Sequence, residues 1–263
     1  MKRYSTVHPL FMSFYSRALY RDVGRNWKGI SFLYLLLLIA ICWIPVMFRI
    51  HSGVSDFLVK EAPAIVRQIP VIRIDHGKVS VDEKMPYFIR NPKKDEPLII
   101  IDTTGQYSSL KGTDAWALLT KTELIMRKSP TEIRTFQMSR IEDLVINRAM
   151  VYNWIETFRK WFAVVLYPFA VLASYVYRII QVLFYAFIGL MFAKNLGLKL
   201  DYQSLVSLAI IADTPSIIIN TLYNYVDVRI PFWLLISFLI AMGYLFYGVK
   251  ANSGKEVGMP AGD

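Results

Sequence analysis

The chain has 263 residues, of which 55% are hydrophobic, 14% aromatic and only 19% charged. With a mean hydropathy of +0.38, this composition is too apolar for a soluble globular protein and indicates an integral membrane protein. The net charge of +10 suits an anionic membrane surface, so we expect the lipid bilayer and no nucleic acid as a partner. The single cysteine, Cys42, excludes an intrachain disulfide and a cysteine-based zinc cluster, and three scattered histidines give no metal pattern. We expect no cofactor.

Two stretches, residues 29–48 and 230–249, have the length and apolarity of a transmembrane helix. A helix needs about 20 apolar residues to cross the hydrocarbon layer. Residues 161–193 form a longer apolar run that is interpreted as one crossing, although two short helices meeting at Arg178 would add a crossing or a re-entrant hairpin. A fourth apolar segment, residues 202–223, contains Asp213 and Pro215. The pattern predicts a membrane bundle over residues 161–249 and about four transmembrane helices in all, with five as the alternative.

Residues 1–28 form a basic amino-terminal segment. Pro9 to Val23 fit an amphipathic helix that would lie along the cytoplasmic membrane surface. Its expected apolar face is Leu10, Phe11, Phe14, Tyr15, Ala18 and Leu19, and the basic face of the segment is Arg17, Arg21, Arg25 and Lys28. The Lys/Arg excess before the first crossing predicts a cytoplasmic amino terminus, a cytoplasmic tail at residues 250–263, and a multi-pass protein of the bacterial inner membrane. A basic leader that serves only to set topology is the alternative interpretation.

Between the first two crossings, residues 49–160 are polar enough for a soluble domain, which this topology places outside the cytoplasm. Short β-branched and aromatic runs separated by turn residues predict strands. The expected strands are residues 71–74, 79–81, 87–89, 98–101, 116–120, 123–126 and 132–136. Helices are expected from Ser55 to Ile69, with a bend or break at Pro63, and from about Ser139 to Phe158. The predicted fold is therefore an α-helical integral membrane protein with a small α+β, mainly antiparallel extracytoplasmic domain inserted between its first and second helices.

One local motif in this domain is the polar turn Asp102, Thr103, Thr104 and Gly105 after an isoleucine-rich strand. Aspartic proteases and aspartyl-phosphate pumps carry similar turns. Here an extra threonine interrupts the protease pattern, no second copy exists, and no nucleotide-binding motif accompanies the aspartate. We interpret the motif as a structural turn in which Asp and Thr side chains bind neighbouring amides, or as part of a partner site.

The second feature is a set of residues in apolar segments, Arg178, Asp213 and Pro215. An ionisable group at membrane depth costs about 3 kcal/mol or more, so such residues usually face a partner, water or the protein interior. Arg178 and Asp213 would pair between helices, and Asp213 would bind a proton or ligand in a helix opened by Pro215. In the alternative, Arg178 extends to an interface while Asp213 caps a half-helix beginning around Pro215.

The chain resembles a bacterial integral-membrane family still described as a domain of unknown function. The similarity rests on Ser13 to Arg21 leading into Lys28-Gly29 and Tyr34-Leu35-Leu36, on Pro86 to Ile89 followed by Ile101 to Gly105, and on Tyr202 to Pro215. That family includes a membrane protein associated with maltodextrin utilisation in bacilli and is distantly similar to Yip-type membrane proteins. The resemblance implies a polytopic inner-membrane protein, and it brings no catalytic residues with it.

These observations lead to the hypothesis of a non-enzymatic inner-membrane scaffold, assembly or regulatory subunit whose extracytoplasmic domain binds an envelope or membrane protein. A second copy of the chain is a further partner that the sequence leaves open. The main alternative is a transporter or transport accessory that uses Arg178 and Asp213. A membrane enzyme that uses Asp102 is the third hypothesis.

Overall fold

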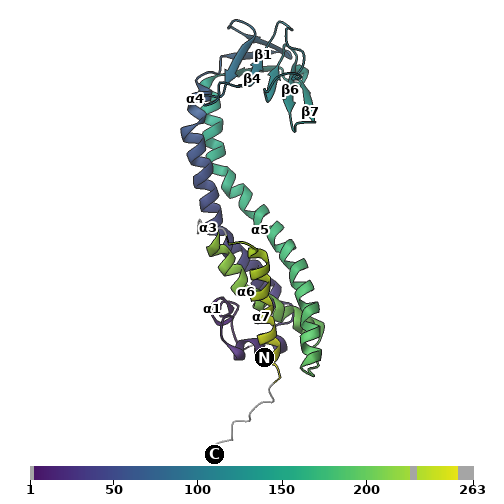
Figure 1. The fold of residues 1–263 in the computed structure, drawn as a ribbon. Coiled ribbons are helices and arrows are strands. Elements are labelled where there is room, and N and C mark those ends of the chain that lie inside the picture. Colours follow the sequence, from purple (N-terminus) through teal and green to yellow (C-terminus); the bar gives the residue numbers. More distant parts are fainter. Residues whose placement is uncertain (1–2, 226–229, 254–263) are drawn as a thin grey trace, which may run out of the picture. The chain divides into compact units, whose positions relative to one another are not determined.

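The computed structural model describes residues 3–225 and 230–253. Residues 226–229, between the last two predicted crossings, and most of the predicted tail at residues 250–263 therefore lie outside the described residues. The chain divides into two compact units. Residues 1–50 and 163–263 make up one, here called the helical unit, and residues 51–162 make up the other, the strand unit (Figure 1).

The helices of the described chain are α1 (Pro9–Met12), α2 (Arg17–Asn26), α3 (Ile30–Lys60), α4 (Ala62–Val66), α5 (Arg148–Asn195), α6 (Tyr202–Tyr223) and α7 (Trp233–Ala251). Four of them, with α3 and α4 counted together, are long and apolar enough to cross a membrane, as predicted. The alternative of two short helices meeting at Arg178 is wrong, because α5 runs through this residue without a break. Pro168 is also accommodated inside α5.

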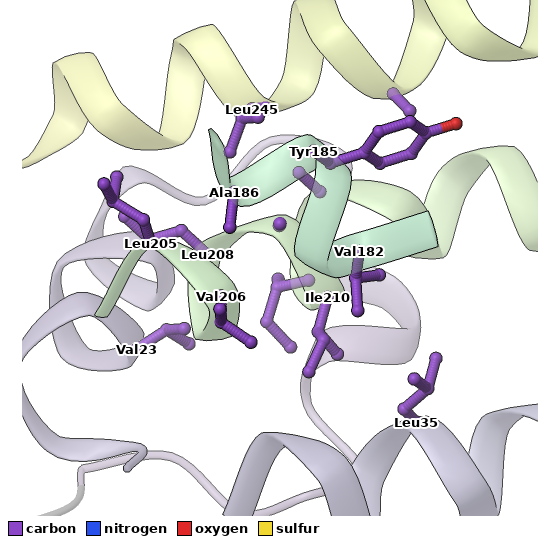
Figure 2. Close-up of a cluster of buried hydrophobic side chains, with 14 of the residues drawn as sticks. Val23, Leu35, Val182, Tyr185, Ala186, Leu205, Val206, Leu208, Ile210 and Leu245 are labelled. Carbon is purple, nitrogen blue, oxygen red and sulfur yellow. The ribbon is translucent and has the colours of Figure 1, made fainter. Parts of the chain in front are cut away.

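The core of the helical unit is built around α6. Its residues from Ser204 to Ile217 are all buried. Side chains from α2, α3, α5 and α7 converge on it, as Figure 2 shows for Val23, Leu35, Val182 and Leu245. By contrast, α3, α5 and α7 expose many large apolar side chains, which suits helices surrounded by hydrocarbon rather than water.

The amino-terminal segment differs from the prediction of one amphipathic helix. Residues 13–16 interrupt it, because Ser16 caps α2 by accepting a hydrogen bond from the Leu19 amide at 3.2 Å. The side of the segment that packs on the protein also differs in part from the expected apolar face. Leu19, Tyr20 and Val23 are buried against the helical core, whereas Phe11, predicted on the apolar face, is 72% exposed. Packing of α2 against α6 and α7 decides which face is buried, and helical periodicity alone does not contain that information.

The strand unit contains two sheets. The first is antiparallel, in the order β2 (Lys78–Val81), β1 (Ile72–Asp75) and β8 (Asp143–Ile146). The second has the order β3 (Tyr87–Arg90), β4 (Pro97–Ile101), β5 (Ala117–Leu119), β6 (Glu123–Arg127) and β7 (Ile133–Gln137), and its neighbours are antiparallel except for the parallel pair β4–β5. All seven predicted strands are confirmed to within one or two residues at their ends, and the sheets are mainly antiparallel as expected.

The helix predicted from Ser139 is wrong over its first part. Met138–Arg140 form a 3-10 turn, Asp143–Ile146 form β8, and α5 begins only at Arg148. Strand β8 pairs with β1 from Ile72 to Asp75, and its Leu144 and Ile146 join the apolar cluster between the sheets. A strand here completes that cluster, whereas a helix could not continue the ladder of β1.

Candidate functional site

The structure brings Arg178 of α5 and Asp213 of α6 together. Arg178 Nη1 donates a hydrogen bond to Asp213 Oδ2 at 3.0 Å. The Asp213 side chain is fully buried, and that of Arg178 is 17% exposed. Arg178 Nη1 also lies 2.7 Å from the Gln181 carbonyl oxygen Oε1, and Gln181 in turn donates to the Tyr185 hydroxyl. The guanidinium therefore joins α5 to the buried centre of α6 through a short polar network.

The second carboxylate oxygen of Asp213, Oδ1, is buried and has no hydrogen-bond partner among the residues that the structure describes. A buried ion pair offsets its desolvation cost only when the remaining lone pairs also accept hydrogen bonds. The unpaired oxygen of Asp213 therefore lowers the free energy of unfolding. The neighbouring hydroxyl of Thr214 bonds with the Tyr34 hydroxyl at 3.0 Å, which ties this point of α6 to α3. Pro215 follows inside the same helix, where it removes one backbone donor, but α6 is continuous from Tyr202 to Tyr223. The expected opening of the helix at Pro215 is therefore wrong, and so is the alternative of a half-helix capped by Asp213, because the N-cap of α6 is Asp201.

A cavity of about 180 Å³ lies beside Arg178, between α3, α5 and α6. Its polar lining includes Ser174 and Arg178 from α5 and Asn220, Thr221 and Asn224 from α6, and α3 contributes Cys42 and Trp43. Trp43 Nε1 donates to Ser174 Oγ at 2.8 Å across this wall. The cavity is large enough for several water molecules or a small polar solute. Sequence reasoning missed it, although the spacing of Asn220, Thr221 and Asn224 puts two of these side chains on one helical face.

The four residues of the predicted polar turn lie at the end of β4. Asp102 is fully buried, and it accepts hydrogen bonds from the Thr104 amide at 2.9 Å, the Thr104 hydroxyl at 2.5 Å and the Tyr107 amide at 2.6 Å. Burial raises the pKa of the Asp102 carboxyl, but these hydrogen bonds outweigh burial and hold the pKa below its usual value. Gly105 supplies the left-handed backbone of the turn, with φ of 87°, and Thr103 is half-buried. This geometry is that of a self-contained turn.

The residues of the predicted basic face, Arg17, Arg21, Arg25 and Lys28, are all exposed. The Arg17 guanidinium lies over the Tyr247 ring, 5.7 Å from its centroid. Arg21 Nε donates to the carbonyl oxygen of Ala251 at 2.7 Å, at the end of α7. The carboxylate of Asp22, in the same helix, is buried. It accepts hydrogen bonds from the Arg3 and Tyr4 amides, which closes residues 3–22 into a loop.

Asp75, His76 and Asp143 form a group whose ligand atoms lie within 4.8 Å of one another, and these are residues that could hold a metal ion. All three side chains are exposed. The hydrogen bond between His76 Nδ1 and Asp75 raises the pKa of His76, and the charges of Asp75 and Asp143 add to this effect. Asp143 reaches His76 through the pairing of β1 with β8, which was not predicted, so the sequence pattern does not reveal this group.

One edge strand of the strand unit is exposed along its whole length. Strand β7 is one of the two edges of the five-stranded sheet, and it is the only described strand in which every residue is exposed. Large apolar side chains are exposed along it and close to it, namely Ile133, Phe136, Met126 and Trp116. Sequence reasoning found the strand but had no signal for its edge position, which depends on the pairing order.

Four membrane-length apolar helices and a small sheet-containing unit define the class of the molecule, an α-helical protein that fits a membrane location. Within this class, a family model described as "Protein of unknown function (DUF1189)" matches residues 7–249, and the chain belongs to this family. The expectation of a family of unknown function is thereby confirmed. Neither the curated proteins nor the solved structures contain a match to this chain.

Proposed function

We propose that the protein is a non-enzymatic anchor of the bacterial inner membrane whose strand unit binds a protein partner by strand addition at β7. An edge strand presents unpaired backbone donors and acceptors, to which an extended segment of another protein can bind. The observation that carries the proposal is the exposure of all five β7 residues beside a set of exposed apolar side chains.

The hydrogen-bond pattern of β7 says which backbone groups are available. The Met138 amide donates to the Thr122 carbonyl, and the Lys128 amide donates to the Glu132 carbonyl. In an antiparallel ladder bonded and non-bonded positions alternate, so the backbone groups of Ile133, Thr135 and Gln137 point to the open side. Specificity would come from side chains beside this edge, chiefly Phe136 and Ile133, which are 47% and 44% exposed.

The proposal includes a cytoplasmic amino terminus and an extracytoplasmic strand unit. Exposed basic residues gather where α3 and α6 begin and where α5 and α7 end, and they are Arg17, Arg21, Arg25, Lys28, Lys194, Lys199 and Lys250. Short cytoplasmic flanks of membrane proteins carry such an excess of Lys and Arg. The polytopic inner-membrane character of the resembled family supports the same arrangement, and a link to maltodextrin utilisation rests on that resemblance alone.

A photo-crosslinking residue in place of Thr135 tests the proposed edge. In intact cells it should give one stoichiometric crosslinked product with another envelope protein, whereas the same probe at Ser80, exposed on the other sheet, should not. In a second experiment the photo-crosslinking residue replaces Phe136, and Thr135 is changed to proline. Thr135→Pro should remove the crosslinked product, because proline lacks the outward-pointing backbone amide but leaves the β6–β7 ladder intact. Thr135→Val is the matched control. Products that are equal at positions 135 and 80, or that contain only the chain itself, would contradict the proposal.

A transporter or transport accessory is the second candidate, and the cavity beside Arg178 favours it. Many transporters bind their substrates at polar sites near the bilayer midplane. The interrupted helices that often build such sites are not found here, since α5 and α6 are both continuous. Asp213→Asn in reconstituted vesicles is the test, with Asp201→Asn, an exposed carboxylate of the same unit, as the control. Loss of solute uptake in Asp213→Asn alone would support this candidate, and equal uptake in both would exclude a role for Asp213 in transport.

A further inference from the structure

A groove of about 480 Å³ runs along α7, on the side that faces the amino-terminal segment. Phe14 and Tyr15 form one wall, and α7 from Leu239 to Tyr247 forms the other. The Phe14 ring meets the Tyr244 ring edge-on at 6.2 Å, and the Tyr247 hydroxyl donates to the Tyr15 carbonyl oxygen at 2.6 Å. These two contacts hold the amino-terminal segment against α7 and leave the groove between them.

The groove is lined by apolar and aromatic residues, and two arginines lie just beyond one of its ends. Leu239 and Ile240 are apolar residues of the middle of α7, and Leu239 lies about 12 Å along the helix from Tyr247, the last residue of α7 that lines the groove, at 1.5 Å per residue. At the other end, Arg17 lies over the Tyr247 ring and Arg21 binds the last carbonyl of α7. One half of a bilayer's hydrocarbon layer is about 15 Å thick, so the groove is long enough for most of an acyl chain below a headgroup.

The floor of the groove is open at Gly243. A Cβ atom added there would have no neighbouring atom within 4 Å. By contrast, a Cβ added at Gly248, five residues further along α7, would lie 2.6 Å from the buried Tyr20 ring. The same helix therefore uses one glycine for close contact with α2 and leaves another facing open space.

We infer that this groove binds one anionic phospholipid, with an acyl chain along Leu239 to Tyr244 and the phosphate beside Arg17 and Arg21. The charge of the two arginines and the apolar lining above them together match a phospholipid, and the overall positive charge of this end of the unit selects an anionic headgroup. The amino-terminal segment then has a role beyond topology, because it completes a lipid site at the membrane surface.

Native mass spectrometry of the full-length protein in detergent, with phosphatidylglycerol or phosphatidylcholine added, tests the inference. The wild-type protein should retain one phosphatidylglycerol molecule and release phosphatidylcholine at lower collision energy. Arg17→Gln should weaken phosphatidylglycerol binding by about fivefold, since one basic residue near a phosphate contributes roughly that factor. Lys194→Gln is the control, because it makes the same charge change at a residue of α5 that does not line the groove.

Gly243→Leu should fill the groove and reduce the binding of both lipids, and Ile240→Trp is a second variant that narrows the groove without altering α2. Circular dichroism and gel filtration verify that each variant is folded. Equal retention of the two lipids by the wild-type protein would overturn the inference. So would an effect of Arg17→Gln no larger than that of Lys194→Gln, or unchanged binding in a folded groove-filling variant.

Discussion

Two aspartates of this chain, Asp102 and Asp213, are both fully buried, but their charges are stabilised in different ways. Asp102 is surrounded by donors within five residues of itself, so its environment forms locally. Asp213 depends on Arg178, which lies 35 positions earlier on another helix, and keeps one oxygen without a partner. Asp102 therefore belongs to a turn, whereas Asp213 belongs to an interhelical contact.

Removal of one member of the Arg178–Asp213 pair should be much more damaging than removal of both. Arg178→Met leaves a buried carboxylate without a counter-charge and should cost about 3 kcal/mol or more, while Arg178→Met combined with Asp213→Leu should be nearly neutral. Unfolding by dodecyl sulfate in mixed micelles measures both changes. A double variant that loses the sum of the two single effects would show that the residues do not stabilise each other.

Asp102→Asn should destabilise the strand unit by roughly 1–3 kcal/mol, because two amides and a hydroxyl lose a charged acceptor. Pulse proteolysis of the full-length protein, with cleavage followed inside residues 51–162, measures the change. Asp82→Asn is the matched control, since Asp82 is an exposed partner of Arg73 and its loss should cost less than about 0.5 kcal/mol. Unchanged stability in Asp102→Asn would contradict the assignment of a structural turn.

The same turn should be sensitive to acid. The pKa of Asp102 is lower in the folded chain than its ordinary value of about 3.9, so folding is favoured above that value and this contribution is lost as the pH falls through the folded pKa. Pulse proteolysis between pH 3 and pH 7 should show a steeper loss for the wild-type protein than for Asp102→Asn. Identical profiles would mean that Asp102 does not contribute to the acid response.

At the scale of elements, the sequence pattern predicted those strands and helices whose formation depends on neighbouring residues in the chain. The seven strands were predictable because β-branched runs alternate between turn residues, and the four long helices because hydrocarbon requires long apolar segments. The ion pair was predictable because few charged residues stand inside apolar segments. Strand β8 was not, because its four residues precede a long helical pattern and are held by pairing with β1. The groove and the cavity were not, because they depend on which helix faces meet.

The contact between α2 and α7 rests on a glycine, and its replacement should separate the two helices. In Gly248→Val the added carbons would meet the buried Tyr20 ring, with the first of them at 2.6 Å, so we expect a cost of roughly 1–3 kcal/mol. Hydrogen exchange of residues 17–26 should become faster. Gly243→Val, which meets no atom within 4 Å at its Cβ, is the control and should leave exchange in α2 unchanged. Equal exchange in the two variants would contradict close packing at Gly248.

At the scale of the whole molecule, the distribution of charge and apolar surface supports a membrane anchor with a partner-binding unit. Exposed apolar side chains cover α3, α5 and α7, exposed basic residues gather at one end of the helical unit, and an exposed strand edge lies in the strand unit. A bilayer would cover the first, lipid phosphates would attract the second, and a protein partner would pair with the third. Exposure of each of these surfaces to water would be unfavourable, and we propose that lipid or protein covers each of them.

We propose above all that the strand unit lies outside the cytoplasm and that the basic end of the helical unit faces the cytoplasm. The most direct test is a topology map by single-cysteine labelling in a Cys42→Ser background, with probes at Ser80, Ser109, Asn195 and Ser253. We predict that a membrane-impermeant thiol reagent labels positions 80 and 109 in intact spheroplasts, and positions 195 and 253 only after the membrane is permeabilised. Labelling of 195 and 253 from outside, with 80 and 109 protected, would contradict the account and move the search for a partner into the cytoplasm.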